Sequence, residues 1–303
     1  MSLANPDHQR NSISTMGAFM TRLATWVRRS AWSLGAAALT TTAGVTGCAS
    51  VSPQQEVQMG QQYSAEINRQ LPIVRDPEVN RYINVLGDSL ARTTSRADLD
   101  WQFYIVDSPE VNAFAVPGGF IYLNRGLIER ARNMSEVAGV LGHEIGHVVR
   151  RHSVKQMEQQ QKANIGLTVG CILAPSVCGN QAAATGIQLG AGAIFARFSR
   201  EDEREADVEG VRISTRAGID PRGIPTMFET LLEERQSRPD AVSAMFTTHP
   251  LEEQRITATR AQIQSEVPTA VLSSLTRDSR NFQAFQQRLR SLPRSPAPAR
   301  PGR

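Results

Sequence analysis

Long apolar runs, internal repeats and, over one stretch, acidic residues are missing from this sequence. No run of 18 apolar residues occurs among its 303 residues, so no segment has the sequence of a transmembrane helix. No segment recurs at a fixed period, which excludes a helical repeat array. No aspartate or glutamate lies between Arg10 and Cys48, which sets this stretch apart from the rest. The overall composition, 40% hydrophobic, suffices for the core of one large domain or two small ones.

Residues 1–47 have the pattern of a bacterial export signal. Arg22, Arg28 and Arg29 precede an apolar stretch over residues 31–45, as in the basic and apolar regions of a signal peptide. An ordinary cleaved signal and an uncleaved membrane anchor are the alternatives. The stretch has about 15 weakly apolar residues, short of the roughly 20 that a spanning helix needs, which counts against the anchor.

The end of this stretch favours lipid attachment. The small residues Val45-Thr46-Gly47 precede Cys48, and this pattern resembles the cleavage site of bacterial lipoproteins. Cleavage would leave Cys48 as a lipid-modified first residue on a membrane that faces the periplasm. Ala49 is not the aspartate that retains many enterobacterial lipoproteins in the inner membrane, so the resemblance favours the outer membrane.

The other two cysteines, Cys171 and Cys178, lie seven residues apart around Pro175. Export permits their oxidation, and we expect a disulfide that closes this loop; two buried free thiols are the alternative. No histidine or further cysteine lies near them in sequence, which disfavours a metal site at this pair.

Charge is distributed unevenly along the chain. Of the total net charge of +4, residues 1–47 carry +3 and residues 271–303 carry +6, which leaves −5 for the residues between them. A basic tail on an acidic body argues against a nucleic-acid-binding core. It favours contact of the tail with an anionic membrane surface or cell-wall polymer, and a solvated disordered tail is the simpler alternative.

Hydrophobic periodicity predicts an α+β fold that is mainly helical, with a small antiparallel sheet. Aromatic and β-branched residues over 101–106 predict one strand. Residues 114–123 predict a strand, a turn at Gly118 and Gly119, and a second strand. The Gly- and Ala-rich stretch 165–196 predicts buried or interfacial helices. Other helices are expected over residues 57–71, 77–90, 134 to beyond 147, 200–218, 224–234 and 278–292.

The segment His143-Glu144-Ile145-Gly146-His147 carries the chemistry. One helical turn separates the two imidazoles, so both can bind one metal ion while Glu144 stands beside it as a general base. This pattern is typical of zinc hydrolases. Asn133 with Glu136 forms a capping-box pattern, which predicts that the helix begins at Met134 or Ser135.

Catalytic zinc needs a third protein ligand and an open position for water. His152 lies five residues beyond His147, about 140° round an extended helix, and is therefore expected to point away from the metal as an exposed or capping residue. Arg150 and Ser153 stand where a metzincin has glycine and histidine, so that class of protease is excluded.

An acidic residue of the run 201–209 is the better third donor. Composition alone does not choose among its six acids, because charged runs are usually solvated helix faces. Glu203 and Asp207 lie one turn apart, so that Glu203 can bind zinc while Asp207 accepts the N–H of a ligand histidine and fixes its tautomer.

Three ordered motifs make the chain similar to a known family. They are the segment 143–147, then Ser199-Arg200 with Glu203-x-x-Ala206-Asp207, then Thr248-His249-Pro250 with Arg255. Over residues 57–263 they resemble the CAAX prenyl endopeptidases and HtpX-like heat-shock proteases, above all the periplasmic, lipid-anchored branch implicated in outer-membrane protein quality control. We expect no tetratricopeptide domain, which one branch carries.

The resemblance implies a gluzincin-type metalloprotease domain over residues 48–270, followed by a basic helix and a disordered tail over 271–303. His143, His147 and Glu203 would bind one zinc ion, with Glu144 as the catalytic base. Asp207 would support a ligand histidine.

The resemblance also assigns residues around the zinc. Asn112, Ala113 and Phe114 match a strand whose edge binds the substrate backbone. His249 matches a histidine that either stabilises the transition state or caps the zinc at rest. Arg255 matches an arginine that supports the site, and it or His249 would meet the developing oxyanion.

The expected function is that of a zinc endopeptidase of the bacterial envelope that degrades misfolded or stalled outer-membrane proteins. Its partners would be unfolded or misassembled envelope proteins and the outer-membrane assembly machinery, with no nucleic acid. One alternative is a chaperone-like lipoprotein whose zinc site His249 holds inactive. The other, a membrane-integrated prenyl-protein protease, is disfavoured because no spanning segment occurs.

Overall fold

The fold comes from a computed structural model, which describes residues 50–160, 197–251 and 253–295. The chain divides into two compact units, and the larger one comprises residues 53–153 and 197–297. In the other unit, the described residues are 50–52 and 154–160, of which 154–160 are helical. The expected export signal, the lipidation site at Cys48, the pair Cys171 and Cys178, and the helices expected over 165–196 lie outside the described residues.

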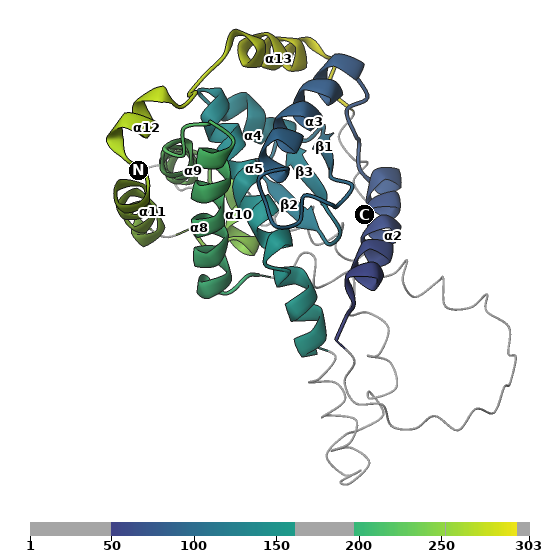
Figure 1. Cartoon of the computed structure of the whole chain (residues 1–303). Helices are drawn as coiled ribbons and strands as arrows, with labels where there is room; N and C mark the ends of the chain where they lie inside the picture. Colours follow the sequence, from purple (N-terminus) through teal and green to yellow (C-terminus); the bar gives the residue numbers. More distant parts are fainter. Residues whose placement is uncertain (1–49, 161–196, 252, 296–303) are drawn as a thin grey trace, which may run out of the picture. The chain divides into compact units, whose positions relative to one another are not determined.

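The larger unit is mainly helical and contains one small sheet (Figure 1). Among the described residues, no helix combines the length and apolar character that a membrane crossing requires. In chain order, the helices and strands of the larger unit are α2 (Pro53–Gln70), α3 (Pro77–Ala91), β1 (Gln102–Val106), β2 (Ala113–Val116), β3 (Phe120–Asn124), α4 (Arg125–Arg130), α5 (Met134–Val149), α8 (Arg200–Arg216), α9 (Gly223–Ser237), α10 (Pro239–Thr248), α11 (Glu253–Glu266), α12 (Thr269–Ser274) and α13 (Arg280–Ser291).

The sheet has three strands in the order β1-β3-β2. A tight turn joins β2 to the antiparallel β3, and Gly118 and Gly119 occupy it at φ of 84° and 100°, which only glycine adopts readily. The α+β class is confirmed, but the sheet is mixed rather than wholly antiparallel, because β1 pairs with β3 in parallel. Residues 107–112 carry the chain from one edge of β3 to the other, so β1 and β2 flank the central strand on opposite sides.

Helix α2 forms where the periodicity predicts it but buries a different face. Ile67 is buried as expected, whereas Met59 and Tyr63 are only half-buried. The buried side carries Glu56 and Gly60 instead. A Cβ at Gly60 would come within 1.9 Å of the Pro117 carbonyl oxygen, so the helix approaches the β2–β3 turn too closely for any side chain there.

Helix α5 lies between the sheet and helices α8 and α9 (Figure 1). Its N-cap is Asn133, whose side chain accepts a hydrogen bond from the Glu136 N–H at 3.2 Å, as the sequence predicts. All its residues from Met134 to Val148 are buried. A helix that is buried on all sides belongs to the centre of a fold, so the polar side chains of α5 are surrounded by other elements.

Helix α8 packs against α5 with little between the two backbones. A Cβ at Gly146 would lie 2.9 Å from the Ala206 carbonyl oxygen, and one at Gly142 would lie 3.2 Å from that of Gly210. The start of α8 is fixed by a capping box between Ser199 and Asp202. Glycines on the facing sides therefore bring the polar side chains of the two helices close together.

Helix α13, the expected amphipathic helix near the C-terminus, packs against α3 and α4. Its apolar residues Phe282, Phe285 and Leu289 are buried in the common core. Arg288 on its outer side makes two hydrogen bonds to Asp76, the N-cap of α3, at 2.8 and 2.9 Å. The helix of the basic C-terminal segment thus shares a core with the rest of this unit.

Candidate metal centre

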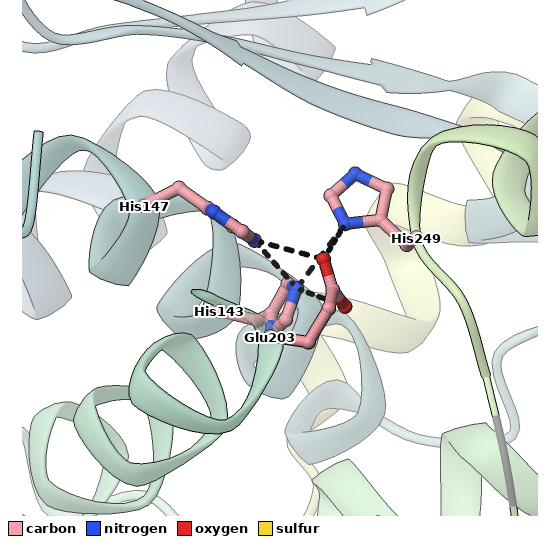
Figure 2. A group of neighbouring side chains, drawn as sticks. All are labelled: His143, His147, Glu203 and His249. Atoms are coloured by element: carbon pink, nitrogen blue, oxygen red, sulfur yellow. Dashed lines mark hydrogen bonds and ion pairs between the residues drawn. The ribbon is translucent and has the colours of Figure 1, made fainter. Parts of the chain in front are cut away.

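Four buried side chains from three parts of the chain converge in the larger unit (Figure 2). His143 and His147 project from α5, Glu203 from the first turn of α8, and His249 from the residue that follows α10. One ligand atom from each lies within 4.8 Å of those from the others. This is the only such group of metal-binding side chains among the described residues.

The donor atoms point at a common centre. The Nε2 atoms of His143 and His147 are 3.0 Å apart. The Glu203 carboxylate lies 3.5 Å from the first and 3.4 Å from the second, and its Oε1 atom is 2.9 Å from His249 Nδ1. Imidazole nitrogens with one carboxylate are the ligands that Zn²⁺ takes in catalytic sites. The donor set therefore fits this ion.

Glu144 supplies a second observation that fits a metal-bound site. Its side chain is fully buried, and neither carboxylate oxygen has a hydrogen-bond partner among the described residues. Its ion-pair partner His249 Nε2 is 3.6 Å away. A buried carboxylate with no donor is costly, and a water molecule held in the centre would satisfy it. Burial raises the pKa of the Glu144 carboxyl above its usual range, despite the opposing effect of nearby His249 and His143.

Asp207 and Arg255 form the support of this centre. Asp207 Oδ1 lies 2.9 Å from His143 Nδ1, the ring nitrogen that faces away from the donor cluster. Arg255 donates to both oxygens of Asp207, at 2.8 and 2.6 Å, and its Nη1 lies 2.5 Å from Glu203 Oε2. These two carboxylates and the Pro250 carbonyl, 3.0 Å away, engage the Arg255 guanidinium. It links the two carboxylates to the loop after His249.

Charges in the cluster suit metal binding. Burial alone would raise the pKa of Glu203, but His249 and Arg255 lower it well below its usual range, so the carboxylate is ionised. Burial lowers the pKa of His147, so its ring is neutral. Metal ligands require these protonation states. Burial alone would lower the pKa of His249, but the carboxylates of Glu203 and Glu144 outweigh it, so the pKa lies above its usual value.

His152 is where the sequence-based expectation is wrong. It was expected to be exposed or capping, yet it is fully buried, with Nδ1 2.9 Å from His147 Nδ1. It contributes no atom to the donor cluster, in agreement with the expectation that it is not a ligand. The 140° estimate assumed that the helix continues, but α5 ends at Val149 and Arg151 has φ of 57°. The helix is therefore interrupted before His152, and the angle expected for a continuous helix does not apply.

Phe198 is a second neighbour that sequence reasoning did not single out. Its ring stacks on His147 with a centroid distance of 4.0 Å, and its N–H donates to the Thr248 carbonyl at 3.0 Å. Together with His249, only 2% exposed, it covers the donor cluster. A lone phenylalanine beside a charged run gives no sequence signal for this role, because the contact joins segments far apart in the chain.

The expected substrate-binding residues lie on the edge strand β2 and just before it. The structure does not bring Asn112, Ala113 or Phe114 into the donor cluster. The carbonyl of Asn112 accepts from Asn124 N–H at 2.9 Å, and its side-chain oxygen has no partner among the described residues. Phe114 stacks on Tyr122 in the neighbouring strand. Strand β2 borders α5, so its edge runs beside the helix that carries the centre.

The fold and this donor set define a metallopeptidase. The sequence profile of peptidase family M48 matches residues 77–263, and the chain belongs to this family. The family predicted from the three motifs is thereby confirmed. M48 proteases bind a metal, and the buried cluster lies within the matched region.

Comparison with individual proteins finds similar proteases from bacteria and from mitochondria. The chain is 34% identical over 238 residues to the beta-barrel assembly-enhancing protease of Escherichia coli (strain K12), which covers 76% of this chain and 48% of that protein. It is 33% identical over 163 residues to the mitochondrial metalloendopeptidase OMA1 of Arabidopsis thaliana, 53% of this chain and 31% of that one. It is 27% identical over 218 residues to the metalloprotease LoiP of Escherichia coli, 72% of this chain and 84% of that one. The chain spans about half the length of the beta-barrel assembly-enhancing proteases it matches.

Proposed function

We propose that this chain is a zinc-dependent endopeptidase of the bacterial envelope. The observation that carries the proposal is the convergence of His143, His147 and Glu203 on one buried point, with the unpaired carboxylate of Glu144 beside it. Relatives named as a beta-barrel assembly-enhancing protease and as metalloproteases support the reaction class. Residues 48–270 would form the protease domain.

The residues divide into ligands, a base and supports. His143, His147 and Glu203 would hold Zn²⁺, which supplies a Lewis acid that makes water a stronger acid. Glu144 accepts the proton of the attacking water, for which its raised pKa suits it, and later returns it to the leaving amine. Asp207 orients His143, and Arg255 keeps Glu203 and Asp207 in place.

His249 is proposed to act in two positions. In the structure, His249 Nδ1 belongs to the group of four donors and lies 2.9 Å from Glu203 Oε1. In this first position it would occupy the side that a substrate carbonyl needs. Displaced from the cluster, its imidazole would be free to donate to the oxyanion of the tetrahedral intermediate. The buried, four-donor arrangement supports a resting state that is closed, and so favours the second candidate function, a quality-control lipoprotein whose proteolysis is mostly held off by His249.

The substrates we propose are misfolded or stalled outer-membrane proteins, on the strength of the name of the beta-barrel assembly-enhancing relatives. Attachment to the outer membrane through a lipid on Cys48 is proposed from the sequence pattern over residues 1–48. Cell fractionation of a Cys48→Ser variant tests it: the variant should leave the membrane fraction, and undiminished membrane association would overturn the lipid anchor.

Replacing Glu144 by glutamine tests the proposed reaction. Glutamine keeps the shape of the side chain but does not accept the proton, so zinc content should stay at the wild-type level while kcat for cleavage of an unfolded outer-membrane protein falls by about 10²- to 10⁴-fold. The matched control is Glu201→Gln on the exposed side of α8. Cleavage by purified Glu144→Gln at the wild-type rate would remove Glu144 from its role. If wild type does not cleave but protects such substrates, the second candidate function holds.

A further inference from the structure

Each of the two metal-facing histidines of α5 has its outer ring nitrogen occupied. For His143 the partner is the carboxylate of Asp207, at 2.9 Å. For His147 the partner is another imidazole, His152, whose Nδ1 lies 2.9 Å from His147 Nδ1 with the two rings edge to face at 76°. Both histidines of this second pair are buried. The metal centre thus has a neighbour that its three motifs do not contain.

The proposed metal site assigns the protons of this pair. His147 Nε2 faces His143 and Glu203, and with a metal bound at this nitrogen the ring proton of His147 has to lie on Nδ1. His152 Nδ1 then has to accept that proton's hydrogen bond. The remaining proton of His152 lies on Nε2, which faces Glu205 Oε2 at 3.4 Å and Asp202 Oδ1 at 3.6 Å. The carboxylates at the start of α8 are therefore joined to His147 through His152.

The backbone beside His152 is strained in a way that serves this contact. Arg151 has φ of 57°, in the left-handed region that residues with a Cβ enter at a cost. Its Nε is held by Glu56 Oε2 at 2.7 Å, and the buried Glu56 is held in turn by Arg96 at 2.6 Å. Strain of this kind persists where surrounding contacts enforce it and collects at functional sites. Here it interrupts the helix at the end of α5, where the His152 side chain lies against His147.

We propose that His152 is a positioning residue of the metal centre: its Nδ1 accepts the His147 Nδ1 proton and so fixes the tautomer and ring orientation of a metal ligand. This inference rests on the proposed zinc site. Outer partners of this kind fix the direction of the ligand's lone pair and make the ligand more basic. Where Asp207 does this for His143, an imidazole backed by Glu205 and Asp202 does it for His147.

Two substitutions at His152 separate hydrogen bonding from packing. His152→Phe keeps a ring of similar size without an acceptor, whereas His152→Asn loses the ring but places Oδ1 where Nδ1 stood. Zinc affinity is measured by competition with a chelator, and the buried neighbour Ser153→Ala serves as the control. We expect His152→Phe to bind zinc about 10- to 100-fold more weakly, and His152→Asn and Ser153→Ala to stay close to wild type.

The outcomes that overturn the inference are distinct. Wild-type affinity in His152→Phe, or equal losses in His152→Phe and His152→Asn, would mean that His152 only packs. Wild type that binds no zinc would overturn the proposed function together with this inference. If circular dichroism shows that His152→Phe does not fold, ¹⁵N NMR of the imidazoles in zinc-loaded wild type tests the proposal instead. His152 should carry its proton on Nε2, and a proton on Nδ1 would refute the proposal.

Discussion

Glu203 is the residue on which the metal centre depends most. It is fully buried and stands between His249, at 2.9 Å, and Arg255, at 2.5 Å, while its two oxygens also face the ligand histidines. Removing a buried charge of this kind leaves its partners without compensation. We therefore propose that the residue serves both as a donor to the metal and as the counter-charge to His249 and Arg255.

Glu203→Ala should lower zinc content well below one ion per chain, because it removes one of three proposed ligands. Zinc per chain is measured by atomic absorption after dialysis against a weak chelator. Glu201→Ala is the control, since Glu201 lies two residues away on the exposed side of α8. A full zinc complement in Glu203→Ala would reassign the third ligand to another acid of α8, Glu205 or Asp207.

At the scale of elements, the contact of α5 with α8 decides whether the ligands meet. The helices approach through Gly142 and Gly146 of α5 and Gly210 of α8. Gly146 lies inside the zinc-binding motif, yet its contribution is steric: any side chain there would push against Ala206 on the helix that carries Glu203. The glycine is needed for the distance between helices rather than for a turn.

Gly146→Ala should weaken zinc binding and lower the free energy of unfolding. Overpacking usually costs about 1–3 kcal/mol, and the better helix propensity of alanine offsets up to about 1 kcal/mol of that cost. The new methyl group would lie 2.9 Å from the Ala206 carbonyl oxygen, so the helices must separate. Zinc affinity by chelator competition and urea unfolding measure the two effects.

Gly218→Ala is the matched control for the effects of Gly146→Ala on zinc affinity and on stability. Gly218 ends α8 at φ of 76° with open space around it, so alanine costs about 1 kcal/mol through backbone strain alone. Stability should fall while zinc affinity stays unchanged. Equal zinc affinity in both variants would show that the close approach of α5 and α8 does not set the ligand geometry.

Asp76 joins two elements, as the N-cap of α3 and as the partner of Arg288 on α13. The hydrogen bonds from Arg288 and from the backbone of Val79 lower its pKa to about 2. A carboxyl whose folded pKa is depressed stabilises the fold above its unfolded pKa, near 3.9, and loses that contribution as the pH falls toward 2.

Asp76→Ala should therefore lower the free energy of unfolding by about 1 kcal/mol at neutral pH, the usual cost of a lost N-cap. The difference from wild type should begin to shrink below about pH 4, because the carboxyl of the unfolded wild-type chain then takes up a proton, and it should be largely lost only as the pH nears the folded pKa of about 2. Urea unfolding between about pH 7 and pH 3 measures it. Exposed Asp98→Ala is the control, and a difference that grows on acidification would contradict the assignment.

At the scale of the whole molecule, the ligands come from α5, from α8 and from the residue after α10, so a bound metal ties distant parts of the chain together. Residues 53–153 and 197–297, on either side of the segment that the structure does not describe, form one compact unit. Metal binding and folding of this unit should therefore be linked.

Removing the metal should lower Tm. At a zinc concentration of about 1,000 Kd the bound ion adds about 4 kcal/mol, which for a unit of this size corresponds to a shift of about 10 °C. Calorimetry with and without a strong chelator measures it. The Glu203→Ala variant should show little chelator effect, and an equal shift in both proteins would mean that the chelator acts elsewhere.

Much of the local structure could be predicted from the sequence, because its signals are short in range. Asn133 and Glu136 predict the start of α5, and the spacing of His143 and His147 follows from one helical turn. Glu203 and Asp207 could be selected from six acids because they share a helix face. Recognition of the family needed only the order of three motifs.

The tertiary structure decided what depends on contacts between distant segments. No spacing reveals that the helix is interrupted at Arg151, that His152 is buried against His147, or that the Phe198 ring stacks on His147. Likewise, Arg255 could be expected near the site, but only packing shows its guanidinium engaged by two carboxylates. The sequence by itself determined which groups are candidates for the metal site, since their chemistry and helical period are local. Which partner orients each of them depends on how α5, α8 and the end of α10 pack, and packing is a property of the whole unit.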